Sequence, residues 1–133
     1  MLLSRLEFGS LFSYPSRPAN DEQKKLKNFV SALKNNKVMS TRPVTITIAI
    51  AEDIANNTSF PFRNFFGSDV TLIPIPSSTL KNKEALHVPY ELAKAFENKG
   101  ICQVIDCVKR VSAIPKSATS RPEDRPTPKR HYE

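Results

Sequence analysis

The sequence contains no tryptophan, only three glycines and only two cysteines among its 133 residues. The glycines, Gly9, Gly67 and Gly100, are isolated from one another, which excludes a P-loop and a Gly-x-Gly-x-x-Gly dinucleotide motif. Cys102 and Cys107 lie five positions apart and make a poor metal pair and a poor disulfide. We therefore expect two reduced thiols, buried or at a strand edge, and a cytoplasmic location.

Long apolar runs and clustered metal ligands are also missing. No stretch of 18 apolar residues could form a membrane span, and the first six residues are too short and too charged for a signal peptide. His87 and His131 are far apart with no cysteine or carboxylate at ligand spacing, so we predict no protein-built metal site. Ser77 and Ser78 lack the Gly-x-Ser-x-Gly context of a hydrolase nucleophile.

Positive charge is abundant and unevenly placed. The formal net charge is +7, and the segment 109–133 alone contributes +4, from seven basic and three acidic side chains. Such a balance favours an anionic partner, either a phosphorylated metabolite or nucleic acid, although a solvated basic tail would have the same composition.

The chain is organised around residues 70–78. Val70–Ile75 is a short, almost continuous apolar run between turn signals, which predicts a strand buried on both faces. Pro74 and Pro76 lack N–H groups, so the chain must leave the sheet there. Hydroxyl and ammonium groups follow, and ligands of open α/β sheets bind beyond the carboxyl ends of the strands. The sequence therefore predicts a phosphate site in this loop.

The residues after this loop predict a second strand. Val88, Leu92 and Phe96 recur at helical spacing, with Pro89 at a favourable first position and a glycine stop at Gly100. Ile101–Ile105 then reads as a strand. The order strand, loop, helix, strand predicts a right-handed βαβ unit with parallel strands over residues 70–105.

The first part of the chain predicts a helix and another strand. A polar cap at Asn20 or Asp21 precedes a helix to about Lys34, whose apolar stripe we expect to pack on a sheet. Strict alternation from Val44 to Ile50 predicts a strand. A cluster of phenylalanines around Pro61 could stack a base, but a hydrophobic plug is the better interpretation.

These patterns give the expected domain organisation. Residues 1–69 form an N-terminal helix and strand portion, residues 70–133 form a second portion, and together they make one compact α/β domain. Residues 112–130 contain four prolines and scattered cations, so we predict a mobile basic loop there.

Residues 70–133 resemble a known family. Leu72-Ile-Pro-Ile-Pro-Ser-Ser78, the helical Glu91-Leu-Ala93 and Val108-Lys-Arg110 before a Pro/Lys/Ser-rich segment resemble type I phosphoribosyltransferases, particularly the ComF-like branch. The resemblance implies a parallel phosphoribosyltransferase-like sheet with flanking helices. It also implies transfer of a 5-phosphoribosyl group between phosphoribosyl pyrophosphate and a nucleobase, with Mg²⁺, and allows a homodimer.

The resemblance also assigns roles to particular residues. The loop Pro76–Lys81 would bind pyrophosphate through Ser77, Ser78, Thr79 and Lys81. The segment 109–130 would be the flexible catalytic loop. The side chains expected to contact the leaving group are Lys109, Arg110 and Lys116, with Arg130 and His131 behind them.

The sequence departs from the family pattern in three respects, one of which is that the resembling part contains only two core strands of the usual parallel sheet. Glu84-Ala-Leu-His-Val88 stands where the branch has an Arg-Gly-aromatic-Asn-Gln run, and an acidic pair followed by a Thr/Gly-rich turn is missing. We therefore expect a C-terminally incomplete copy that is inactive in this form. The alternatives are a non-catalytic relative that binds nucleotide or nucleic acid through the basic C-terminal segment, and an interaction protein whose basic tail docks on an acidic partner.

Overall fold

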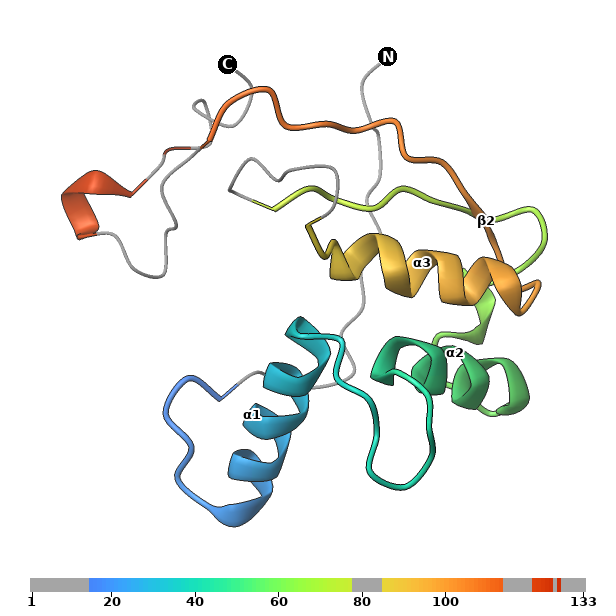
Figure 1. Cartoon of the computed structure of the whole chain (residues 1–133), viewed down its shortest axis with the longest axis horizontal. Coiled ribbons are helices and arrows are strands. Elements are labelled where there is room, and N and C mark those ends of the chain that lie inside the picture. Colours follow the sequence, from blue (N-terminus) through green and yellow to red (C-terminus); the bar gives the residue numbers. More distant parts are fainter. Residues whose placement is uncertain (1–14, 78–84, 114–120, 126, 128–133) are drawn as a thin grey trace.

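The described part of the chain is a mixed α/β structure with three α-helices and a small parallel sheet (Figure 1). The computed structural model describes residues 15–77, 85–113, 121–125 and 127. The elements in chain order are α1 (Asp21–Lys34), α2 (Ile46–Asn56), the 3-10 turn η1 (Arg63–Phe65), β1 (Thr71–Leu72), α3 (Val88–Asn98), β2 (Gln103–Val104) and the 3-10 turn η2 (Pro122–Asp124).

The predicted pairing of parallel strands around a helix is confirmed. β1 and β2 are adjacent and parallel, with Thr71 opposite Gln103 and Leu72 opposite Val104. Backbone hydrogen bonds extend this pairing on both sides, because the N–H of Gln103 donates to Val70 O at 2.8 Å and that of Ile105 to Leu72 O at 3.1 Å. The connection runs through α3, which lies alongside both extended segments in Figure 1.

The prediction that Val70–Ile75 is buried on both faces is wrong. Exposure alternates along the segment: Pro74 is buried, whereas Ile73 and Ile75 are 45% and 66% exposed. The alternation follows from strand geometry, because successive side chains point to opposite faces, and Leu72 on one of them packs against the buried cluster that contains Phe96 of α3.

α1 begins and ends where the sequence predicts. The Asn20 side chain accepts a hydrogen bond from the N–H of Gln23 at 2.9 Å, which satisfies one of the free donors of the first turn. The expected packing of its apolar stripe on a sheet is wrong, because α1 contacts α2 and none of its residues is buried.

The strand predicted from Val44 to Ile50 is also wrong, because most of this segment belongs to helix α2. The alternation stops at Ala51, and the buried residues Thr47, Ala51 and Ile54 recur at helical spacing. Ala51 and Ile54 pack into a cluster with Ala95 and Phe96 of α3. Helix propensities of β-branched residues are only about 0.7 kcal/mol below that of alanine, so packing against α3 outweighs them.

A single asparagine links the end of α1 to the start of α2. Asn36 has a left-handed backbone with φ of 44°, a conformation that asparagine tolerates better than most residues. Its side-chain oxygen accepts a hydrogen bond from the Thr47 hydroxyl at 2.8 Å. Thr47 is only 1% exposed, so Asn36 satisfies a hydroxyl that burial would otherwise leave without water.

The core lies between α2, α3 and the start of β2. Its buried members include Ala51, Ala95 and Phe96, and the small alanines allow the two helices to approach closely. The phenylalanine segment closes this core, because Phe60 and Phe66 pack against it and the Phe66 ring lies 5.1 Å from that of Phe96. These contacts support the plug interpretation, although Phe65 remains 44% exposed.

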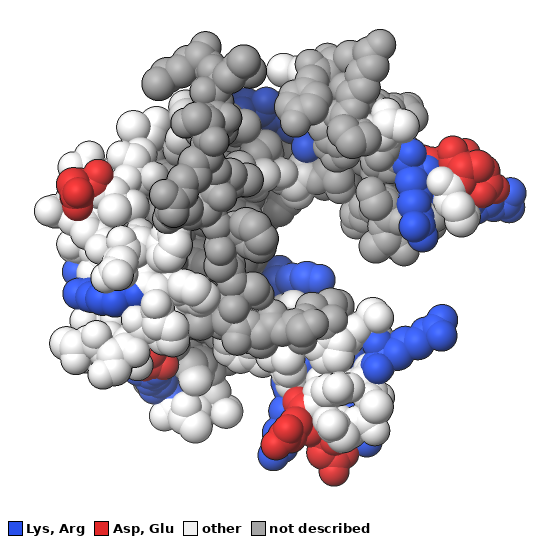
Figure 2. Space-filling view, turned by 180° about the vertical axis from the view of Figure 1, so that it is seen from behind, with Lys and Arg blue, Asp and Glu red and all other residues white. Residues whose placement is uncertain are grey.

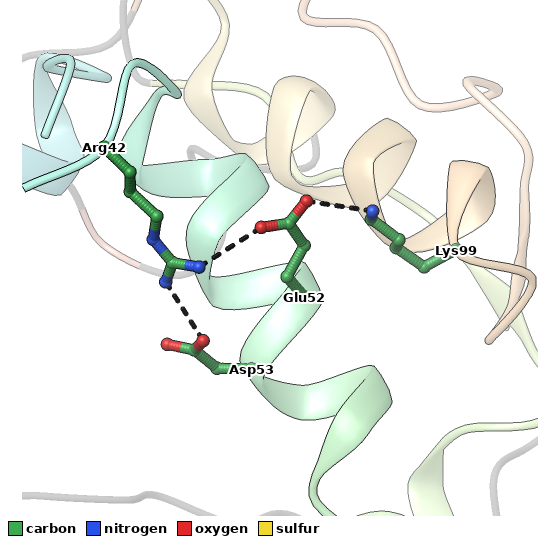
Figure 3. A network of polar contacts seen from close by, with 4 residues as sticks. All are labelled: Arg42, Glu52, Asp53 and Lys99. Carbon is green, nitrogen blue, oxygen red and sulfur yellow. Dashed lines mark hydrogen bonds and ion pairs between the residues drawn. The ribbon is translucent and has the colours of Figure 1, made fainter.

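A polar network fixes α2 against the end of α3 (Figure 3). The Glu52 carboxylate accepts hydrogen bonds from Arg42 Nη1 at 3.2 Å and from Lys99 Nζ at 3.0 Å, and Arg42 Nη2 donates to Asp53 Oδ1 at 3.0 Å. Both cations and both carboxylates have partners, so we assign the network a structural role. Each partly exposed pair contributes less than about 1 kcal/mol.

Candidate functional site

Three segments of the chain meet at the carboxyl edge of the sheet. They are residues 75–77 after β1, residues 87–90 at the start of α3, and residues 105–110 after β2 (Figure 1). The topology requires this meeting, because parallel strands end at the same edge and the connecting helix begins there. The first turn of α3 therefore presents backbone N–H groups at the edge where the sequence predicts a phosphate site.

A hydrogen bond joins the two strand ends directly. Arg110 Nε donates to the backbone carbonyl of Ser77 at 2.7 Å, although the residues are 33 positions apart. Arg110 is half-buried, and within the described part of the chain its two Nη groups have no hydrogen-bonding partner. A guanidinium fixed through Nε still has four N–H donors, in a geometry that suits phosphate oxygens.

The start of α3 is fixed to the same edge by a histidine. His87 Nε2 lies 3.3 Å from the carbonyl oxygen of Ile75, so this nitrogen carries the proton and donates. The Tyr90 ring is parallel to the imidazole within 6°, with ring centroids 6.4 Å apart. The sequence had indicated only that His87 is not a metal ligand. Its position two residues before Pro89 places it at the start of α3, but no sequence pattern indicates its contact with Ile75 O.

The structure brings together two of the residues predicted for the site, Ser77 and Arg110. Lys109 is exposed, and the alternation of side chains along an extended segment directs it away from the Arg110 side. Seven other residues named in the sequence analysis lie outside the described residues. They are the predicted site residues Ser78, Thr79, Lys81 and Lys116, the residues expected behind the site, Arg130 and His131, and Glu84, where the sequence departs from the family pattern.

Glu97 fastens β2 to α3 behind the site. One carboxylate oxygen accepts the backbone N–H of Val104 at 2.9 Å, and the other pairs with the Lys94 ammonium. The Lys94 hydrogen bond lowers the pKa of the Glu97 carboxyl below its usual value, and the Val104 N–H lowers it further. The ionised carboxylate is therefore favoured by the folded state.

The Glu97 contacts predict a dependence of stability on pH. The pKa of Glu97 is lower in the folded state than in the unfolded state. The stabilisation of the fold by ionised Glu97 is therefore complete at pH values above the unfolded-state pKa, and it is lost as the pH falls through the folded-state pKa. Glu97→Gln should therefore flatten the acid side of the stability profile, and Lys94→Gln should do so in part, because the Val104 N–H remains. Urea unfolding at a series of acidic pH values measures this, and profiles parallel to the wild type would contradict it.

The cysteines and the acidic residues provide no second centre in the described segments. Both thiols are free, and burial raises the pKa of Cys102, which favours its protonated form. Cys107 is exposed. Among the described residues, no group of three or more His, Cys, Asp or Glu side chains could hold a metal ion.

Basic side chains on the described surface are interspersed with acidic ones. Figure 2 shows blue and red residues next to each other at several separate places rather than one continuous blue stripe. Lys24, Arg42, Lys94 and Lys99 form ion pairs with carboxylates. Nucleic-acid binding by the basic C-terminal segment remains a prediction.

Comparisons of the chain with models of known protein families, with curated proteins and with solved structures find no match. Within the described residues, no helix combines the length and the apolar character that a membrane crossing requires.

Proposed function

We propose that the carboxyl edge of the β1–α3–β2 unit binds the pyrophosphate group of a phosphoribosyl pyrophosphate-like ligand, as the resemblance to phosphoribosyltransferases implies. The observation that carries the proposal is the 2.7 Å hydrogen bond from Arg110 Nε to Ser77 O. This contact holds a guanidinium beside the end of β1, in the segment where both the residue pattern and the resemblance placed phosphate recognition.

The donors at this edge suit a diphosphate. The Arg110 Nη groups can form two parallel hydrogen bonds to one phosphoryl group, and the first turn of α3 adds backbone N–H groups and a positive partial charge. In a phosphoribosyl transfer the same donors would stabilise the charge that develops on departing pyrophosphate. Transfer also requires a site for the ribose phosphate, and the acidic pair and Thr/Gly-rich turn are missing from the sequence. We therefore propose pyrophosphate binding by the described residues, without assigning the ribose phosphate to any of them.

Mg²⁺ would enter the site with the ligand. The described residues provide no cluster of three or more metal-binding side chains, whereas Mg²⁺ commonly uses one or two carboxylates, substrate phosphates and several waters. Asp106, exposed on the extended segment after β2, is a carboxylate close in sequence to Arg110 and could supply one such ligand. The ion would neutralise part of the pyrophosphate charge there.

Calorimetric titration of pyrophosphate with Mg²⁺ tests the proposal. We expect weak, saturable binding to the wild type and a reduction of several-fold or more in the Ser77→Ala/Ser78→Ala double variant, because hydroxyl donors are lost. Lys129→Ala, which removes a cation from the C-terminal segment, is the comparison and should have a smaller effect. Equal affinities of the double variant and the wild type would show that the loop has only a structural role.

A further inference from the structure

The extended segment that follows β2, residues 105–110, forms an outer edge of the sheet. In Figure 1 this orange trace continues past β2 as a long extended run. β2 is paired with β1 on one side only, because the sheet of the described residues has two strands. A two-stranded sheet is marginal by itself, and three or more strands are usually needed for stability.

The direction of the backbone groups along this edge can be derived from the observed hydrogen bonds. The N–H groups of Gln103 and Ile105 point to β1, so those of the even-numbered residues point outward. At Val104 the outward N–H is taken by Glu97 Oε1 at 2.9 Å. Beyond it, the outward backbone groups of Asp106, Val108 and Arg110 have no hydrogen-bonding partner among the described residues.

This edge combines two exposed apolar side chains, Ile105 and Val108, with the charged residues Asp106, Lys109 and Arg110. Ile105 is 50% exposed and Val108 is 42% exposed, so pairing with a further strand would remove apolar surface from water. The two charged residues that flank Val108 at equal distance, Asp106 and Arg110, have opposite signs. The charges of this segment are therefore complementary to those of a second copy that runs antiparallel to it.

The geometry points to an antiparallel pairing of this edge with the same edge of a second copy of the chain, about a two-fold axis at Val108. In that register Val108 lies opposite the partner's Val108, and Asp106 lies opposite the partner's Arg110. The residues that would exchange backbone hydrogen bonds with the partner are all even-numbered. This agrees with the observed structure, in which the odd-numbered residues Gln103 and Ile105 direct their N–H groups to β1. The two sheets join into one sheet of four strands.

Other registers are less favourable for stated reasons. An axis at Asp106 or at Arg110 places like charges directly opposite each other, which destabilises a strand pair. An axis at Cys107 places Asp106 opposite the partner's Val108 and leaves the carboxylate without a cation. The axis at Val108 pairs both charges and covers the exposed valine.

Disulfide trapping tests the register without any ligand, so its outcome is independent of the pyrophosphate proposal. In a Cys107→Ser background, Val108→Cys should form a covalent dimer under mild oxidation. Facing residues of a hydrogen-bonded pair have Cα atoms about 5.5 Å apart, within disulfide range. Ile105→Cys in the same background is the matched control and should form little dimer, because the two copies would be roughly 20 Å apart.

Charge reversal tests the facing pair. Asp106→Arg should shift the wild-type dimer to monomer in sedimentation velocity, and Asp106→Arg/Arg110→Glu should restore the dimer by exchanging the two signs. A wild type that remains monomeric throughout, equal trapping of both cysteine variants, or a dimer that Asp106→Arg does not affect would overturn the proposed pairing.

Discussion

Phe96→Ala is expected to lower the free energy of unfolding by about 3–4 kcal/mol, which is a large part of the stability of a small domain. Phe96 is 7% exposed and packs in the cluster that joins α3 to α2 and to the residues before β2. Its ring also contacts Phe66, whose centroid is 5.1 Å away. Alanine would remove these contacts and leave a cavity at the centre of the cluster that joins α2 and α3.

Urea unfolding of the variant measures this loss, with Phe65→Ala as the matched control. Phe65 is 44% exposed and contacts the Phe62 ring edge-on at 5.9 Å, so its removal should cost about 1 kcal/mol or less. Equal losses in the two variants would show that the core is not organised around the contact of α2 with α3.

Arg110→Ala is expected to weaken pyrophosphate binding about tenfold or more. A charge-assisted hydrogen bond contributes about 1.5–3 kcal/mol, and 1.4 kcal/mol corresponds to a tenfold change. Arg110 is only half-buried, so the lower end of this range applies. Arg110→Lys should bind with intermediate affinity, because it keeps the charge and loses the planar arrangement of donors.

Arg121→Ala is the matched control for this titration. It removes the same charge from an exposed position next to η2 and should change the affinity little. If both alanine variants lost affinity equally, pyrophosphate would be responding to the net charge of +7 rather than to the site beside β1.

Much of the second half of the chain could be predicted from its sequence because local signals there agree with each other. Pro89 at the start of α3 and Gly100 at its end, with φ of 70°, fix a helix between two apolar segments. A short helix between two strands leaves parallel pairing as the natural arrangement. The meeting of Ser77 with Arg110 follows from the same topology, since both lie just beyond paired strands.

The first half was less predictable because tertiary contacts decide its structure. Ile46, Ile48 and Ile50 alternate as in a strand, yet the helix that continues to Asn56 buries Ala51 and Ile54 against α3. Periodicity alone could not reveal that partner. The hydrogen bond of His87 with Ile75 O was missed for a related reason, because a side chain that binds a backbone carbonyl leaves no sequence pattern.

The most direct measurement is a pyrophosphate titration of isotopically labelled protein followed by NMR. Saturable shifts are expected for the Arg110 Nε–H, for the Ser77 amide and for the amides of the first turn of α3, with smaller shifts along α1, which also carries lysines. Shifts confined to lysine-rich surfaces such as α1, or no saturable shifts at the edge beyond β1 and β2, would contradict the proposed site.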